Sequence, residues 1–167
     1  GTELNTGDAL LVRWLEQRIQ GVAAELDQDF TQFRLSEAIK LLYSFVWDDY
    51  CSFFLEAAKP RSGQAMPAML ADGAQSGFLQ ICSLLHPFMP FVTEEIWQQV
   101  APRLGKTGAT IATQALPQAS DFACDEIAAA DIEWLKAVLS GLRRIRSEMN
   151  IAPAKLVPLV LEGGDAK

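Results

Sequence analysis

The sequence of 167 residues contains one histidine and three cysteines, and this scarcity narrows the chemistry that the chain can perform. A single histidine, His86, argues against the many enzyme classes that rely on a pair or a triad of histidines. The cysteines, Cys51, Cys82 and Cys124, have no Cys-x-x-Cys spacing that would hold zinc. Because they are odd in number and far apart, we expect free thiols, a reduced cytoplasmic location and no metal site.

Long apolar runs and an excess of positive charge are also missing. No run approaches the roughly 20 apolar residues of a membrane helix, so no membrane contact is expected. The first eight residues lack the basic and apolar regions of a secretory signal. Fourteen Lys and Arg against 21 Asp and Glu give a net charge of -7, which argues against non-specific binding of nucleic acid. A nucleic-acid contact would therefore have to be local and shaped.

Apolar periodicity predicts an all-α helical bundle with one main core, in a chain that is 50% hydrophobic. Helical spacing in the first segment predicts a helix over 7–27 whose buried stripe is Leu11, Leu15, Ile19, Val22 and Leu26. Further helices are expected over 34–59, 67–85, 93–97 and about 125–149. The 34–59 helix is apolar on most sides and should be central in the bundle. Gly73 and Gly77 predict a close helix contact.

Two segments read as non-helical. Residues 102–122 predict a loop with at most one edge strand, Thr110–Thr113. The last helix is expected to stop at Asn150. Residues 156–161 have the pattern of a strand, but the sequence offers no further strands to pair with it. We therefore expect the chain to be part of a longer protein. We therefore expect a helical bundle over 1–150, and a linker with the start of the next segment over 151–167.

Candidate chemical groups are few. His86 precedes Pro87 without a nucleophile motif, so a structural role at a helix end is predicted. Asp48 and Asp49 point about 100° apart on a helix, which predicts solvated or capping acids, with Glu56, rather than a carboxylate pair. The four tryptophans could stack on unpaired bases, but all lie in apolar helices and are predicted to be core: Trp14, Trp47, Trp97 and Trp134. No catalytic residue is assigned.

Positive charge gathers near the end of the chain. From Lys136 to Lys155 there are five basic residues against one acid, Glu148. Helical spacing places Lys136, Arg143 and Arg146 along one ridge that could face phosphates. The alternative is an ordinary solvent-exposed face, because the helix dipole favours cations near a helix C-terminus.

Three stretches together resemble the valyl-tRNA synthetase family: FVWDDYCSFFLEAAKP (45–60), HPFMPFVTEEIWQ (86–98) and RIRSEMNIAPAK (144–155). The resemblance extends from Arg13 to Leu161 and implies the anticodon-binding helical bundle of a class I aminoacyl-tRNA synthetase. The His-Ile-Gly-His and Lys-Met-Ser-Lys-Ser signatures of that class are not in this chain. The resemblance therefore implies a non-catalytic piece with no cofactor of its own. ATP and Mg²⁺ would serve the full enzyme, whose catalytic domain and coiled coil would be its partners.

This resemblance implies recognition of the anticodon arm of valine tRNA, through the second-position adenine and the third-position cytosine. The candidate RNA-binding residues are Arg13, Arg18, Lys59, Arg61, Arg143, Arg146 and Lys155. Arg13 and Arg18 match arginines of the family pattern. The sequence departs from that pattern after Cys51, where Ser52-Phe53-Phe54 replaces the common Asp-Trp-Tyr and puts any polar contact there in doubt.

Three alternatives stay open. The chain could come from an isoleucyl or leucyl enzyme. It could be a helical protein-interaction module, whose signature would be an exposed apolar patch of roughly several hundred Å². A hydrolase built on His86 is disfavoured by the missing nucleophile motif.

Overall fold

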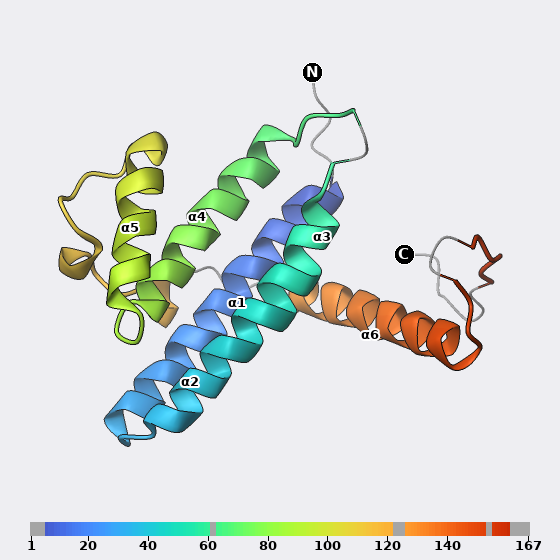
Figure 1. The fold of residues 1–167 in the computed structure, drawn as a ribbon, viewed down its shortest axis with the longest axis horizontal. Coiled ribbons are helices and arrows are strands. Elements are labelled where there is room, and N and C mark those ends of the chain that lie inside the picture. The colour runs from blue at the N-terminus through green and yellow to red at the C-terminus, as the bar shows by residue number, and fades with distance from the viewer. Residues whose placement is uncertain (1–5, 61–62, 122–125, 153–154, 161–167) are drawn as a thin grey trace. The chain divides into compact units, whose positions relative to one another are not determined.

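The computed structural model describes residues 6–60, 63–121, 126–152 and 155–160, and the chain divides into two compact units, 1–132 and 133–167. The described residues contain helices and no strand, which confirms the all-α prediction (Figure 1). Apart from short 3₁₀ turns, the helical elements are α1 (Thr6–Thr31), α2 (Leu35–Ser44), the π-helix η1 (Phe45–Phe54), α3 (Leu55–Ala58), α4 (Ala68–Leu85), α5 (Pro90–Val100) and α6 (Glu126–Glu148).

Helix α1 is the central element of the first unit, with α2 and α4 packed against it (Figure 1). All five residues of its predicted stripe are buried, and Trp14 is fully buried beside them. The contact with α4 is close because α4 carries glycines there. A Cβ added at Gly73 would lie 2.7 Å from the Val12 side chain, and one at Gly77 would lie 2.7 Å from that of Leu15. The predicted close contact is confirmed.

The predicted 34–59 helix is one helical run of three parts, α2, η1 and α3. Its middle part is π-helical and buries Phe45, Asp49, Tyr50 and Phe54. The expectation that this run is central in the bundle is wrong, because α1 holds the central position and the described neighbours of the run cover one side of it. A second apolar face of α2 and η1 is exposed along Leu35, Ile39, Tyr43 and Trp47.

Helices α4 and α5 meet at a corner. The Thr93 hydroxyl donates to the carbonyl of Met89 at 2.8 Å, so its oxygen accepts from Nδ1–H of His86 at 2.7 Å. The prediction of a structural helix-end histidine is confirmed. Pro90 starts α5 because the first position of a helix needs no amide hydrogen.

The segment after α5 is built from single 3₁₀ turns, η2 (Ala101–Leu104), η3 (Ile111–Thr113) and η4 (Ala119–Asp121). The prediction of a loop with at most one edge strand is confirmed in its main part, and Thr110–Thr113 forms a turn rather than that strand. The Thr110 hydroxyl accepts from the amide of Ala112, and the Glu94 carboxylate accepts from the Thr110 hydroxyl and from the Ile111 amide. These bonds wind the segment into a turn against α5. Ile111 then completes a small second core with Leu79, Cys82, Trp97 and Ala101.

The second unit contains most of α6 and the residues after it. Asn150 has φ +51°, the left-handed conformation that stops a helix, as predicted. Residues 155–160 have no regular secondary structure, so the expected strand is wrong over this stretch. The described residues offer no partner strand to form one. Leu161, the last residue of that prediction, lies outside the described residues.

Candidate RNA-binding surface

Arg18 of α1, a predicted site residue, forms an ion pair with Asp49 of η1. Nε and Nη2 of Arg18 donate to the same oxygen, Oδ2 of Asp49, at 2.9 and 2.7 Å. The Asp49 side chain is only 10% exposed, whereas that of Arg18 is 38% exposed. The expectation that Asp49 is solvated or caps a helix is wrong. Asp49 lies on the buried side of the π-helix, which faces α1. Its neighbour Asp48 does remain at the surface, where it accepts from the Ser44 hydroxyl at 2.9 Å.

Arg13 lies one turn before Arg18 on α1 and is exposed. The two residues are five positions apart, which is about 140° around a regular helix. The structure therefore places the two matched arginines on different faces of α1. They could contact one RNA only if it wraps around the helix or if they meet different parts of it.

Of the two candidates at the end of the run α2–η1–α3, the structure describes only Lys59. Lys59 is exposed and pairs with Glu56 one turn earlier. Such an exposed pair contributes little stability and leaves the ammonium accessible to a phosphate. Arg61 lies outside the described residues.

In the second unit the basic residues separate into two kinds. Arg143 and Lys155 are exposed. Nη2 of Arg146 donates to the backbone carbonyls of Ala152 and Lys155 at 2.7 and 2.8 Å, so this guanidinium fastens the following segment to α6. Lys136 pairs with Glu133 at 3.1 Å. The predicted ridge therefore contains one cation with a structural contact and one with an ion pair.

Phe53 and Phe54, where the sequence departs from the expected pattern, make aromatic contacts. Phe53 meets the Trp14 indole edge to face, with ring centroids 5.0 Å apart, and Phe54 stacks on Tyr50 at 5.6 Å. Ser52 is exposed. Phe54 thus lies in the core, and the partly buried Phe53 packs against it.

Burial keeps two ionisable groups neutral, Tyr50 in the main core and Cys82 in the small second core. Burial raises the pKa of Tyr50 well above its ordinary value, and the Tyr50 hydroxyl donates to the carbonyl of Ala74 at 3.2 Å. Burial also raises the pKa of Cys82 to about 11. Cys51 and Cys82 are free thiols, and Cys124 lies outside the described residues. A buried neutral thiol of this kind is chemically inert.

The tryptophan prediction is half right. Trp14 and Trp97 are buried, but Trp47 is 59% exposed and Trp134 is 61% exposed. Sequence reasoning also missed Asp49 as an ion-pair partner. Asp49 follows the apolar Phe45 by four residues, so it lies on the same side of a helix as Phe45. That spacing could have indicated that Asp49 faces the core.

The described residues contain no group of three His, Cys, Asp or Glu that could hold a metal ion. No helix in the same part of the chain is long and apolar enough to cross a membrane.

Comparison with known proteins places this chain in a family. A family model described as the anticodon-binding domain of tRNA ligase matches residues 12–161. A valine–tRNA ligase of Xanthomonas campestris pv. campestris (strain B100) is 46% identical over 160 residues, and one of Stenotrophomonas maltophilia (strain K279a) is 43% identical over 157 residues. These matches cover 92% and 91% of this chain but 17% of each relative, so the chain spans about a sixth of their length. The chain belongs to the family of anticodon-binding domains of tRNA ligases.

Proposed function

We propose that this chain is the anticodon-binding part of a valine–tRNA ligase and that it holds the anticodon arm of valine tRNA. The observation that carries the proposal is the similarity of 92% of the chain to valine–tRNA ligases at up to 46% identity. Residues 1–150 are the RNA-binding bundle, and 151–167 begin the next segment of a cytoplasmic enzyme. The ligation of valine, with its ATP and Mg²⁺, belongs to the catalytic domain of that enzyme, and the catalytic domain and a coiled coil are the partners of this bundle.

Arg18 is the residue best prepared to contact RNA. A guanidinium has five N–H donors, and the two bonds to Asp49 use two of them. The carboxylate fixes the orientation of the guanidinium, so less side-chain entropy is lost when the remaining donors bind. An anticodon loop offers base edges and phosphates to such a group.

The other candidates fix the position of the RNA rather than read its bases. Arg13, Lys59, Arg143 and Lys155 are exposed cations suited to phosphates, and we include Arg61 with them. Arg146 acts indirectly, through the segment that it fastens to α6. The net charge of -7 weakens non-specific attraction to RNA, so discrimination depends on the shaped site. We expect affinities in the micromolar range or weaker for the chain alone, because the contacts of other domains are missing.

The test is a fluorescence anisotropy titration of the chain against an anticodon stem-loop of valine tRNA, at two salt concentrations. A hairpin with the second anticodon base changed from adenine is the RNA control. The proposal requires tighter binding of the valine hairpin. Equal binding of both hairpins, in the chain and in the complete ligase, would overturn it.

Arg18→Ala tests the residue assignment. We expect a loss of about 1 to 3 kcal/mol in binding if Arg18 reads a base, or a salt slope lower by about one unit if it meets a phosphate. Arg103→Ala is the matched control, since Arg103 is an exposed arginine of the same unit that belongs to no predicted site. If both variants bind like the wild type, Arg18 is not in the site.

The alternative within the family is tested with the same method. Hairpins with isoleucine or leucine anticodons replace the valine hairpin. Preference for either would assign the chain to that enzyme instead.

A further inference from the structure

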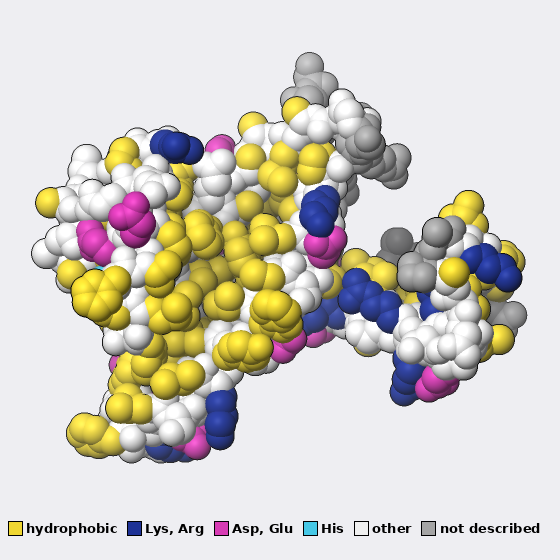
Figure 2. All heavy atoms as spheres, in the orientation of Figure 1, with side chains coloured by type: hydrophobic (Ala, Val, Ile, Leu, Met, Phe, Trp, Pro, Cys, Tyr) yellow, Lys and Arg dark blue, Asp and Glu magenta, His cyan; other side chains and the backbone are white. Residues whose placement is uncertain are grey.

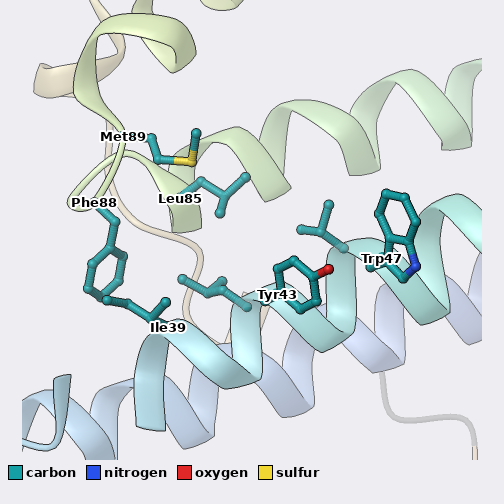
Figure 3. A pocket seen from close by; sticks show the side chains of 8 residues that line it. Ile39, Tyr43, Trp47, Leu85, Phe88 and Met89 are labelled. Atoms are coloured by element: carbon teal, nitrogen blue, oxygen red, sulfur yellow. The ribbon is translucent and has the colours of Figure 1, made fainter. Parts of the chain in front are cut away.

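Two hollows in the described part of the first unit differ in chemistry. Figure 2 shows hydrophobic side chains gathered between α2, α4 and α5. The groove on this face has a volume of about 470 Å³, and its described lining, which includes Tyr43, Trp47 and Phe88, is uncharged (Figure 3). A wholly apolar lining does not select one class of ligand, because polar groups supply the specificity of a binding site. The second hollow contains such groups.

The second hollow is a pocket of about 280 Å³ between α4, α5 and the segment 106–117. Its size is close to the lower end of small-molecule sites, which is about 300 Å³. Its apolar part comes from the buried Leu79 of α4 and Trp97 of α5, and from Ala115 and Pro117. The polar residues of its lining are Ser76, Gln80, Ser83, Lys106 and Gln114.

Most polar side chains of this pocket are not used by the fold. Within the described part of the chain, those of Ser76, Gln80 and Lys106 have no hydrogen-bond or ion-pair partner. The Ser83 hydroxyl donates to the carbonyl of Leu79 at 3.1 Å, and its oxygen can still accept. The pocket therefore offers donors and acceptors to a ligand.

The segment that carries Lys106 and Gln114 is held in place by hydrogen bonds. The Lys106 amide donates to the carbonyl of Ala101 at 3.0 Å, and the Gln114 amide donates to that of Ile111 at 2.9 Å. Nε2 of Gln114 donates to the carbonyl of Thr110 at 3.2 Å, which leaves Oε1 as an acceptor. A pocket whose walls are fixed in this way loses less entropy when it binds.

Lys106 sets the charge of the ligand that fits. It is exposed, and no acidic residue is among the described residues that line the pocket with it. An ammonium group forms its strongest hydrogen bonds with an anionic acceptor such as a carboxylate. Because Leu79 and Trp97 supply an apolar floor, the matching ligand has one negative group and an apolar body.

We propose that this pocket binds a small monocarboxylate with a branched or aromatic body. The carboxylate pairs with Lys106, and the body lies against Leu79 and Trp97. The pocket shares no residue with the candidate RNA-binding surface, so the inference goes beyond the proposed function and does not depend on it.

An NMR titration of the ¹⁵N-labelled chain tests the proposal with two acids, isovalerate and phenylacetate, and with their neutral amides. We expect the acids to shift the backbone amide signals of 76–83 and 106–117 until the site is saturated. The neutral amides should bind at least about tenfold more weakly, because they lack the charge that pairs with Lys106. Inorganic phosphate, an anion without an apolar body, should also bind more weakly than the acids.

Three variants locate the site. Lys106→Gln should weaken the binding of both acids at least about tenfold and leave that of the neutral amides unchanged. Lys40→Gln is the matched control and should bind like the wild type, because Lys40 is an exposed lysine of α2 that does not line the pocket. Ala115→Phe places a ring on an exposed wall of the pocket and should abolish the binding of acids and amides alike.

Four outcomes would overturn the proposal. The first is that neither acid gives a saturable shift in 76–83 and 106–117. Equal affinity for acids and amides would show that the pocket takes up apolar solutes without reading their charge. Phosphate that binds as tightly as the acids would show a plain anion site. Unchanged binding of the acids by Lys106→Gln would remove Lys106 from the site.

Discussion

Arg18 and Asp49 are 31 positions apart in sequence and form an ion pair that joins α1 to the π-helix η1. Two nitrogens of the guanidinium share one carboxylate oxygen, and the carboxylate is almost buried. A charge in such a place is tolerated only with a partner. The same contact thus serves stability and fixes the orientation of the arginine that we expect to meet RNA.

Asp49→Asn should lower the free energy of unfolding by about 1 to 3 kcal/mol, since a charged hydrogen-bond acceptor becomes a neutral one. The exposure of Arg18 keeps the effect below that of a fully buried pair. Asp48→Asn is the control and should change stability by less than about 0.5 kcal/mol, because Asp48 lies at the surface. Urea unfolding measures both. Equal losses for the two variants would show that the ion pair contributes no special stability.

Two glycine substitutions should have opposite effects. A Cβ at Gly77 would lie 2.7 Å from Cδ2 of the buried Leu15, so Gly77→Ala should destabilise the protein by about 1 to 3 kcal/mol. No atom lies within 4 Å of a Cβ at Gly21 in α1, so Gly21→Ala should stabilise it by about 0.5 to 1 kcal/mol. Thermal unfolding checks the pair. A stabilising Gly77→Ala would contradict the close approach of α1 and α4.

Glu94 should make the free energy of unfolding of the first unit depend on pH. Hydrogen bonds from the Thr110 hydroxyl, then from Gln98 and the Ile111 amide, lower the pKa of this carboxyl from its ordinary value of 4.5. The contribution of Glu94 is therefore present above that value and is lost as the pH falls through the lower pKa of the folded state. We expect the wild type to lose more stability than Glu94→Gln between about pH 6 and pH 3.

The control for this pH series is Glu95→Gln. Glu95 is exposed and accepts from Gln99 one turn later, but it does not bind the 3₁₀ turn. Urea midpoints across the pH range give the comparison. Parallel pH curves for the wild type and Glu94→Gln would rule out the effect.

Arg146→Ala should release the segment that follows α6. The guanidinium donates to the carbonyls of Ala152 and Lys155, whereas Arg144 forms only a surface pair with Glu148. Limited proteolysis should cut Arg146→Ala faster between 150 and 160, and Arg144→Ala at the wild-type rate. Unchanged cleavage of Arg146→Ala would show that other contacts hold the segment.

Sequence periodicity predicted the helices of this chain and the buried stripe of α1, because a repeat of three and four residues reports which side of a helix meets the core. The corner at His86 was also predictable, from two prolines that end one helix and start the next. The turn at 110–113 was not. β-branched residues there allowed at most an edge strand within a loop, but hydrogen bonds to the Glu94 carboxylate, distant in sequence, hold a turn instead.

The site was less accessible to sequence reasoning than the fold. Composition places tryptophans inside, and it does so for Trp14, but the same reasoning failed for Trp47, because only a three-dimensional arrangement shows that α2 has an uncovered face. Asp49 was missed for a related reason. Its position four residues after Phe45 indicated a buried side chain, but no pattern in the sequence indicates that Arg18 of α1 lies opposite it.

The position of α1 at the centre of its unit has a consequence during synthesis. Helix α1 ends at Thr31, but α4, which covers it, begins only at Ala68. At about 5 to 20 residues per second, a ribosome needs about 2 to 7 seconds to deliver that interval. During this time α2 can already pack against α1. Leu15 and the rest of the side of α1 that faces α4 stay exposed until α4 has been synthesised. Nascent chains of this length should therefore be substrates for chaperones that hold exposed apolar helices.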